Sequence, residues 1–141
     1  LKNLANKKAP AFTLTDFNGN EVSLKSYEGK VILLDFWASW CGPCVRGMPT
    51  IQELYKKYKD KGFVVIGILT FEKNFEKAKQ IVTQHGYNYP MLIDDKKVST
   101  DYLVKTTIPQ YVIIDENGKI EFAKKANLPE AEKIIHSKFS N

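Results

Sequence analysis

Two cysteines, Cys41 and Cys44, are the side chains of this sequence best suited to redox chemistry. They are its only cysteines, and Gly42 and Pro43 separate them. A single local pair of this kind favours a working dithiol over a disulfide framework that holds a fold together. A structural zinc site needs four ligands, and both histidines lie far from the pair in the sequence. We therefore expect thiol chemistry and no metal site.

The elements predicted on either side indicate how this pair would react. Residues 31–36 form an apolar, β-rich run, and apolar side chains follow the cysteines at the i, i+3, i+4 spacing of a half-buried helix. The thiols should lie where that helix begins, because a buried strand and a tight turn precede it. Free amides and the helix dipole stabilise a thiolate there. We expect Cys41 to be the more acidic, more exposed and attacking sulfur, and Cys44 to resolve the mixed disulfide.

The segment DFWASWCGPC resembles the active-site segment of the thioredoxin superfamily. The longer stretch APAFTL…DFNGNEVSLKSYEGKVILLDFWASWC is similar to its extracytoplasmic TlpA/ResA-type and peroxiredoxin-like (AhpC/TSA-Redoxin-like) branches. The resemblance implies a thioredoxin-like, three-layer α/β/α fold with a mixed central sheet and an N-terminal β-hairpin extension. It also implies a thiol:disulfide oxidoreductase that needs no cofactor beyond the redox-active Cys41–Cys44 disulfide.

Ile108 and Pro109 are the second segment that the resemblance marks. In thioredoxin-like proteins, the residue before a cis-proline lies opposite the C-x-x-C motif and pairs its backbone with an extended substrate. Taken alone, the sequence favours a trans proline that starts a strand, because cis X-Pro bonds are uncommon; the resemblance reverses that preference. The predicted substrate-binding residues are Trp40, Gly42, Pro43, Thr107, Ile108 and Pro109.

Asp35 is a charged residue inside the apolar run, six positions before Cys41. Burial should raise its pKa, because a desolvated carboxylate resists ionisation. Thioredoxins carry a buried acid at the matching position, so the resemblance implies that Asp35 takes the proton of Cys44 during resolution. The alternative is an aspartate at a strand end that reaches water or caps a turn.

Two residues of the predicted helix bear on the same chemistry. TlpA/ResA-type proteins often carry Glu three residues after the second cysteine, and this chain has Gly47 there. This departure weakens any transfer of their specialised acid–base arrangement. Arg46 could support the thiolate, although an exposed helix arginine is the commoner explanation.

Composition sets broader limits. The chain is 43% hydrophobic and 26% charged, which predicts one globular domain over residues 1–141, with residues 1–9 as a loose lead-in. Net charge is +5, but Arg46 is the only arginine among 21 basic residues, and the lysines are scattered. We expect no nucleic-acid partner, because phosphate recognition favours clustered arginines.

We expect the protein to be a monomer. The resemblance favours an extracytoplasmic location; a cytoplasmic location and a membrane tether outside this chain stay open.

The remaining pattern alternates strands and helices. Residues 10–23 predict a hairpin that turns at Asn18 and Gly19. Further strands are predicted over residues 63–69, 110–114 and 120–123, and a short strand or extended piece over residues 89–93. Helices are predicted over residues 75–85, 97–102 and 129–139. This order predicts a mixed sheet flanked by helices.

Three functions are compatible with these features. The first is a reductase of protein disulfides that an upstream thiol donor reduces again. We favour it because Gly42 and Pro43 match reducing thioredoxins, whose reduction potentials lie near about −270 mV, against about −120 mV for strongly oxidising relatives. A thiol peroxidase is the second, although the Pro-x-x-x-Thr-x-x-Cys run of peroxiredoxins is absent. A copper-handling module with Cys41 and Cys44 as ligands is the third, although such modules usually space their cysteines one residue wider and add a distal histidine.

Overall fold

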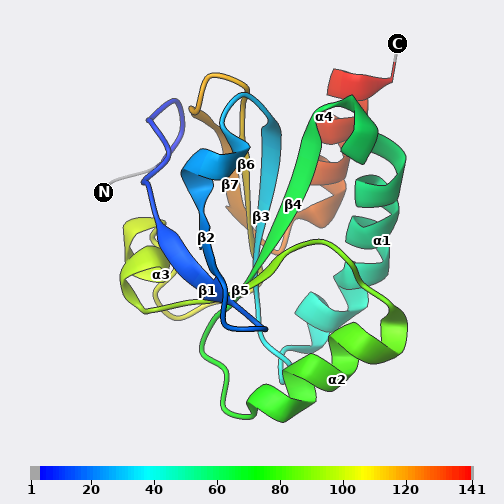
Figure 1. Cartoon of the computed structure of the whole chain (residues 1–141). Coiled ribbons are helices and arrows are strands. Elements are labelled where there is room, and N and C mark those ends of the chain that lie inside the picture. The colour runs from blue at the N-terminus through cyan, green and yellow to red at the C-terminus, as the bar shows by residue number, and fades with distance from the viewer. Residues whose placement is uncertain (1–3, 141) are drawn as a thin grey trace.

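The computed structural model describes residues 4–140 and places its strands in one seven-stranded sheet (Figure 1). The strands are β1 (Thr13–Asp16), β2 (Glu21–Ser23), β3 (Val31–Trp37), β4 (Phe63–Leu69), β5 (Met91–Ile93), β6 (Gln110–Ile114) and β7 (Ile120–Lys125). Their order across the sheet is β2-β1-β5-β4-β3-β6-β7. Because β3 pairs in parallel with β4 and antiparallel with β6, the sheet is mixed, as predicted.

Helices cover both faces of this sheet. They are α1 (Gly42–Tyr58), α2 (Phe75–His85), α3 (Lys97–Asp101) and α4 (Leu128–Phe139). In Figure 1, α1 and α4 lie together on one side of the central strands and α3 lies on the other, which gives the predicted three-layer, thioredoxin-like arrangement. Within residues 4–140, no helix combines the length and the apolar character needed to cross a bilayer.

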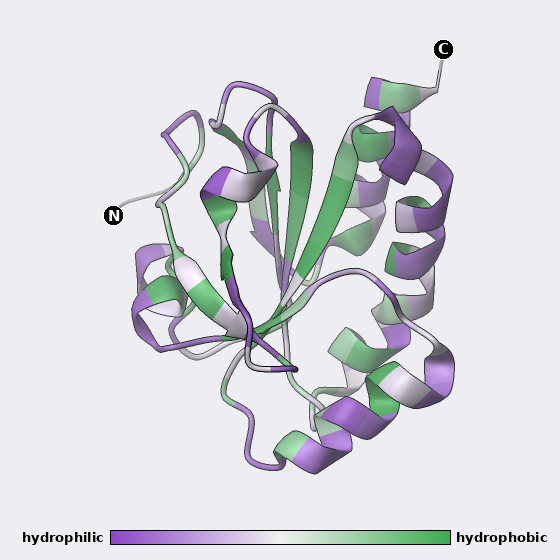
Figure 2. Cartoon of the chain, in the orientation of Figure 1, coloured by the Kyte–Doolittle hydropathy of each residue, from purple (hydrophilic) through white to green (hydrophobic). Residues whose placement is uncertain are grey.

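The central strands are the most buried part of the fold. Every residue of β3 and β4 is buried, as continuous apolar runs in parallel strands should be. Figure 2 shows these strands in green and much of the helix surface in purple. Asp35 is the one charged residue in β3, and it lies directly opposite Gly67 of β4 and Tyr111 of β6.

The N-terminal hairpin is also confirmed. β1 and β2 pair antiparallel, and the Asp16 carboxylate accepts hydrogen bonds from the amides of Asn18 and Asn20 at 2.8 and 2.9 Å. Gly19 has φ +87°, a conformation that glycine adopts without a steric penalty. β1 continues the sheet by pairing antiparallel with β5, so the extension lies at an edge of the core sheet.

The described part of the predicted loose lead-in is held in place. The amides of Asn6 and Ala9 donate to the carbonyls of Ile120 and Gly118, at 2.7 and 2.9 Å. Ala9 is buried. Residues 4–9 therefore contact the β6–β7 turn, a pairing between distant segments that local composition does not reveal; residues 1–3 lie outside the described residues.

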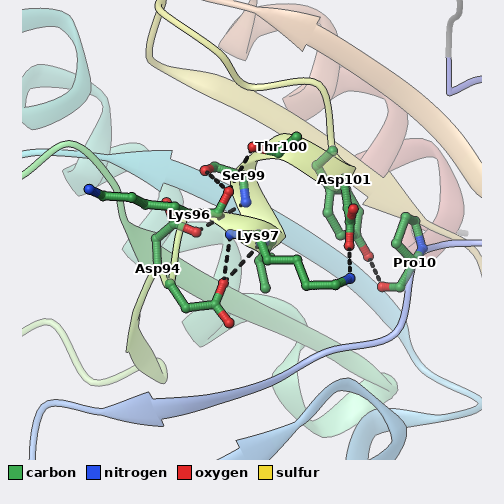
Figure 3. Close-up of polar contacts among 10 residues, drawn as sticks. Pro10, Asp94, Lys96, Lys97, Ser99, Thr100 and Asp101 are labelled. Carbon is green, nitrogen blue, oxygen red and sulfur yellow. Dashed lines mark hydrogen bonds and ion pairs between the residues drawn. The ribbon is translucent and has the colours of Figure 1, made fainter.

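The segment between α3 and β6 carries Pro109, and hydrogen bonds from Tyr102 and Gln110 hold it in place. Figure 3 shows the polar contacts around α3, among them the Lys97–Asp101 ion pair at 2.6 Å. Just after α3, the buried Tyr102 donates its hydroxyl hydrogen to the carbonyl of Pro10 at 2.6 Å. The side-chain amide of Gln110 donates to the Tyr102 carbonyl at 2.9 Å. These bonds fix the loop that precedes β6.

Candidate active site

The two cysteines lie at the start of α1 and form a disulfide. Cys41 is the N-cap residue of the helix, and the amide of Cys44 points at its sulfur, with an N···Sγ distance of 3.2 Å. Pro43, which has no amide hydrogen, lies in the first turn. When the disulfide is reduced, a thiolate at Cys41 would therefore keep a hydrogen bond and the positive end of the helix dipole.

The exposure of the two cysteines follows the predicted order. Cys41 is 4% exposed and Cys44 is fully buried. Cys41 is nevertheless more covered than expected, because the loop before β6 packs over it: the Ile108 carbonyl oxygen lies 3.8 Å from its Sγ.

The Ile108–Pro109 peptide bond is cis, as the resemblance implies. Pro109 directly precedes β6, the neighbour of β3, and its carbonyl accepts a hydrogen bond from the amide of Ala126 at 2.9 Å. The structure thus brings the Ile108 backbone to Cys41 from 67 residues away. Thr107 is exposed on the same loop.

Arg46 folds back over the first turn of α1. A Cβ atom added at Gly42 would lie 2.9 Å from Nη1 of Arg46, so the guanidinium group packs against the Gly42 backbone. This contact places a fixed positive charge beside the C-x-x-C motif and favours the first of the two roles considered for Arg46.

Asp35 is fully buried, and neither carboxylate oxygen has a hydrogen-bond partner among the residues described. Burial raises the pKa of Asp35 to about 7. The alternative of an aspartate at a strand end, exposed to bulk solvent or capping a turn, is therefore wrong. A carboxyl group with a pKa near 7 is suited to take and return a proton at neutral pH.

Gly47, which stands where TlpA/ResA-type proteins often carry a glutamate, is closely surrounded by side chains. An added Cβ would lie 3.0 Å from Cδ2 of Leu128 and 3.1 Å from the hydroxyl oxygen of Tyr111. Tyr111 is buried and stands opposite Asp35 in the β3–β6 ladder. The phenol thus fills the space that a longer side chain would need.

Trp40 was predicted to bind substrate, but three residues beside it, Ser39, Phe71 and Glu72, were not predicted from the sequence. Trp40 and Phe71 are 49% and 37% exposed, and the Trp40 indole N–H donates to the Phe71 carbonyl at 2.8 Å. The Glu72 carboxylate accepts hydrogen bonds from both the amide and the hydroxyl of Ser39, each at 2.7 Å. Partial burial opposes ionisation, but hydrogen bonds from Ser39, Lys73 and Asn74 outweigh it and lower the pKa of Glu72.

The fold and this site define a class. A mixed sheet with helices on both faces, a C-x-x-C disulfide at a helix N-terminus and an opposing cis-proline are the features of thioredoxin-like dithiol–disulfide proteins. Within that class the chain belongs to the Redoxin family, whose model matches residues 4–137.

Named relatives agree with this assignment. The chain is 39% identical over 115 residues to the thiol-disulfide oxidoreductase ResA of Bacillus thuringiensis (strain Al Hakam), a match that covers 81% of this chain and 65% of that protein. It is 36% identical over 116 residues to the thioredoxin-like protein YneN of Bacillus subtilis (strain 168), covering 82% of this chain and 68% of that protein. The chain thus spans slightly less than two thirds of the ResA relative.

Solved structures show the same fold. The crystal structure of the thioredoxin domain of a thiol-disulfide oxidoreductase from Bacteroides vulgatus superposes with a TM-score of 0.81 at 28% identity, over 95% of this chain and 99% of that one. The solution structure of a thiol:disulfide interchange protein from Bacteroides sp. gives 0.80 at 26% identity, over 99% and 95%.

Proposed function

We propose that this protein is a thiol:disulfide oxidoreductase and that it works as a reductase of protein disulfides. The observation that carries the proposal is the position of Cys41. Its Sγ accepts a hydrogen bond from the Cys44 amide at the start of α1 and lies 3.8 Å from the carbonyl oxygen of Ile108. The backbone of an extended substrate could form hydrogen bonds with this carbonyl. The names of the ResA and YneN relatives support the same chemistry.

The reaction is an exchange of disulfide bonds. The Cys41 thiolate attacks one sulfur of the substrate disulfide, so that a Cys41–substrate bond forms while the substrate S–S bond breaks. The departing substrate sulfur leaves as a thiolate and is protonated. Cys44 then attacks Cys41, which releases the second substrate thiol and closes the Cys41–Cys44 disulfide seen here. The substrate gains two electrons, and a dithiol donor must return them to the protein.

Asp35 acts as the proton acceptor of the second step. Cys44 is fully buried, so it needs an internal base before it can attack as a thiolate. The raised pKa of Asp35, about 7, allows the carboxylate to be present at neutral pH and to hold the proton it receives.

The substrate-binding surface would combine backbone and aromatic contacts. The Ile108 backbone supplies hydrogen-bonding groups beside Cys41, and Trp40 and Phe71 supply exposed apolar area on the other side. Gly42, Pro43 and Thr107 complete the rim. A largely sequence-independent surface of this kind suits an extended peptide segment around a disulfide more than a small molecule.

Location and assembly are part of this proposal. We place the protein outside the cytoplasm, on the strength of the similarity of its N-terminal region to extracytoplasmic TlpA/ResA-type proteins, with a thiol donor upstream. We also propose that it is a monomer in solution.

The test is the reduction potential together with turnover of a protein disulfide. We expect the dithiol to reduce insulin and to equilibrate near about −270 mV, as reducing thioredoxins do. A potential above about −180 mV would contradict the reductase direction and favour oxidation or isomerisation instead. Peroxide turnover that survives Cys44→Ser, or tight copper binding without insulin reduction, would replace the proposal by the corresponding alternative.

A further inference from the structure

Three buried polar groups on one face of the sheet have no hydrogen-bond partner among the residues described. They are the carboxylate of Asp35, the indole N–H of Trp37 and the hydroxyl of Tyr89. Asp35 and Trp37 are two positions apart in β3, so their side chains project to the same face. Each buried polar group left without a partner costs on the order of 1–3 kcal/mol, so three together call for an explanation.

Gly67 of β4 lies next to the residues of this cluster. Gly67 is the direct partner of Asp35 in the β3–β4 ladder. A Cβ atom placed on Gly67 would lie 2.6 Å from Sδ of Met91, 3.3 Å from Nε1 of Trp37 and 3.5 Å from Cε2 of Tyr89, so the Met91 sulfur packs into the same space. The negative charge of Asp35 also acts on Tyr89, because after burial it is the next cause that raises the pKa of that phenol.

Tyr89 connects this cluster to the surface. Its ring lines an open cleft of about 500 Å³, together with Tyr55, Tyr87 and Asn88. Tyr87 stacks on Tyr89 with 6.2 Å between ring centroids, and Tyr55 packs edge-on against it at 5.9 Å. Tyr89 is therefore beside the cleft, while its hydroxyl oxygen is buried.

We propose that water enters beside Tyr89 and hydrogen-bonds to Asp35, with Trp37 Nε1 and the Tyr89 hydroxyl as its other partners, so that this side of the sheet is the proton route between Asp35 and solvent. This inference rests on the proposed function for its purpose. Tyr89 is a positioning residue in it, because its hydroxyl holds the water and does not touch substrate.

The route completes the proton balance of the second exchange step. Cys44 transfers one proton to Asp35 as it attacks Cys41, and the neutral Asp35 must lose that proton before the next cycle. The water accepts it and passes one proton on to the solvent in the cleft, so that Asp35 returns to its charged form. Apart from water, the titratable groups whose pKa responds to Asp35 are Tyr89 and Tyr111, and both pKa values are raised, chiefly by burial, so neither phenol ionises near neutral pH.

The experiment uses NMR on the oxidised protein, which needs no turnover. The first readout is a cross-peak between water and the Trp37 indole hydrogen, whose pH dependence should follow the titration of the Asp35 carboxyl carbon. The second is the Asp35 titration in Tyr89→Phe. Loss of the hydroxyl removes support for the charged carboxylate, so the midpoint should rise by about 0.5–1 pH unit. The matched control is Tyr55→Phe, which changes a tyrosine of the same cleft and should leave the midpoint unchanged.

The outcomes separate the two proposals. The absence of a cross-peak between water and the Trp37 indole hydrogen would overturn the water route. So would an Asp35 titration midpoint that Tyr89→Phe leaves unchanged, or one that Tyr55→Phe shifts as much as Tyr89→Phe does. If Tyr89→Phe does not fold, the water cross-peak of the unmodified protein decides alone. Failure to reduce any disulfide would contradict the proposed function, while both NMR readouts would still report on the route.

Discussion

At Cys41, three features favour the thiolate. The Cys44 amide donates to its sulfur, the residue caps α1, and the Arg46 guanidinium packs on the adjacent Gly42. The first two come from the backbone and cannot be removed by a side-chain change. The contribution of Arg46 can be measured separately.

Replacing Arg46 by Gln should raise the pKa of the Cys41 thiol, because the thiolate loses a nearby positive charge. We expect a rise of about 0.3–1 pH unit. The measurement is the pH dependence of iodoacetamide alkylation in a Cys44→Ser background. Lys56→Gln removes an equal charge from the last turn of α1 and should leave the thiol pKa unchanged; an equal effect from both variants would assign the role to net charge alone.

Asp35 should make the stability of the folded protein fall as pH rises. Its pKa is about 7 in the folded protein against 3.8 in the reference state, so the folded state binds the extra proton between these values. Its contribution is fully present below about pH 4 and is lost as pH rises through about 7. The loss is of order 2–4 kcal/mol.

Urea unfolding of the oxidised protein at pH 5 and pH 8 measures this loss. Asp35→Asn has no titrating group at this position, so its free energy of unfolding should change less between the two pH values and exceed that of the unmodified protein at pH 8. Parallel pH profiles for the two proteins would show that Asp35 is not desolvated as described.

At the scale of elements, the loop between β4 and α2 belongs to the site because Glu72 ties it to the turn before α1. The Glu72 carboxylate holds the amide and hydroxyl of Ser39, and the same loop presents Phe71 next to Trp40. Residues 33 positions apart in the sequence are thereby brought into one rim. Loss of this contact should therefore weaken substrate binding more than it changes the reactivity of the Cys41 sulfur.

Replacing Glu72 by Ala should raise KM for a protein disulfide about 3–10-fold with little change in kcat, because the Trp40–Phe71 surface loses its anchor. Steady-state reduction of insulin provides the measurement, and the pKa of Cys41 should stay unchanged. Glu76→Ala is the matched control, since Glu76 forms only a surface ion pair with Lys79 at 3.9 Å. A variant that lowered kcat alone would contradict this role of the loop.

The elements with strong local patterns were predictable from the sequence. β4 was predicted with its observed bounds because its apolar run is uninterrupted, and α2 because Asn74 caps its start and Gly86 ends it with φ +68°. The short strand or extended piece predicted over residues 89–93 contains β5, but the strand itself begins at Met91, because Pro90 lacks the N–H that a ladder needs.

The candidate site was predictable only where a motif marks it. Cys41, Cys44 and Pro109 belong to recognisable motifs, and Asp35 stands out as a charge in an apolar run. Glu72 and Ser39 carry no such signal. Their contact forms only because the loop that follows β4 lies beside the turn that precedes α1. Tyr89 and Trp37 look like ordinary core aromatics until their unpartnered polar atoms are seen together.

For the molecule as a whole, the N-terminal hairpin and the dithiol site share one hydrophobic core. Phe12 packs against Tyr102 with 6.2 Å between ring centroids, and Tyr102 in turn contacts Phe36 of β3 at 5.8 Å. Tyr102 also holds the carbonyl of Pro10 and, through Gln110, the loop that carries Pro109. The extension should therefore be part of the folding unit that builds the site.

Chemical unfolding of the oxidised protein should accordingly be one cooperative transition. Far-UV circular dichroism, which follows the whole sheet, and Trp fluorescence, which follows the site, should give the same midpoint. Tyr102→Phe should shift both midpoints together. Two separated transitions would show that the hairpin and the site region unfold independently, against the single domain predicted from the sequence.

The central claim is that Cys41 attacks and Cys44 resolves, and trapping with single-cysteine variants tests it most directly. When reduced Cys44→Ser meets a protein disulfide, a mixed disulfide on Cys41 should accumulate, because no second thiol can release it. Cys41→Ser should trap little or nothing, since Cys44 is fully buried. Adducts that form on Cys44 in preference to Cys41 would contradict the account.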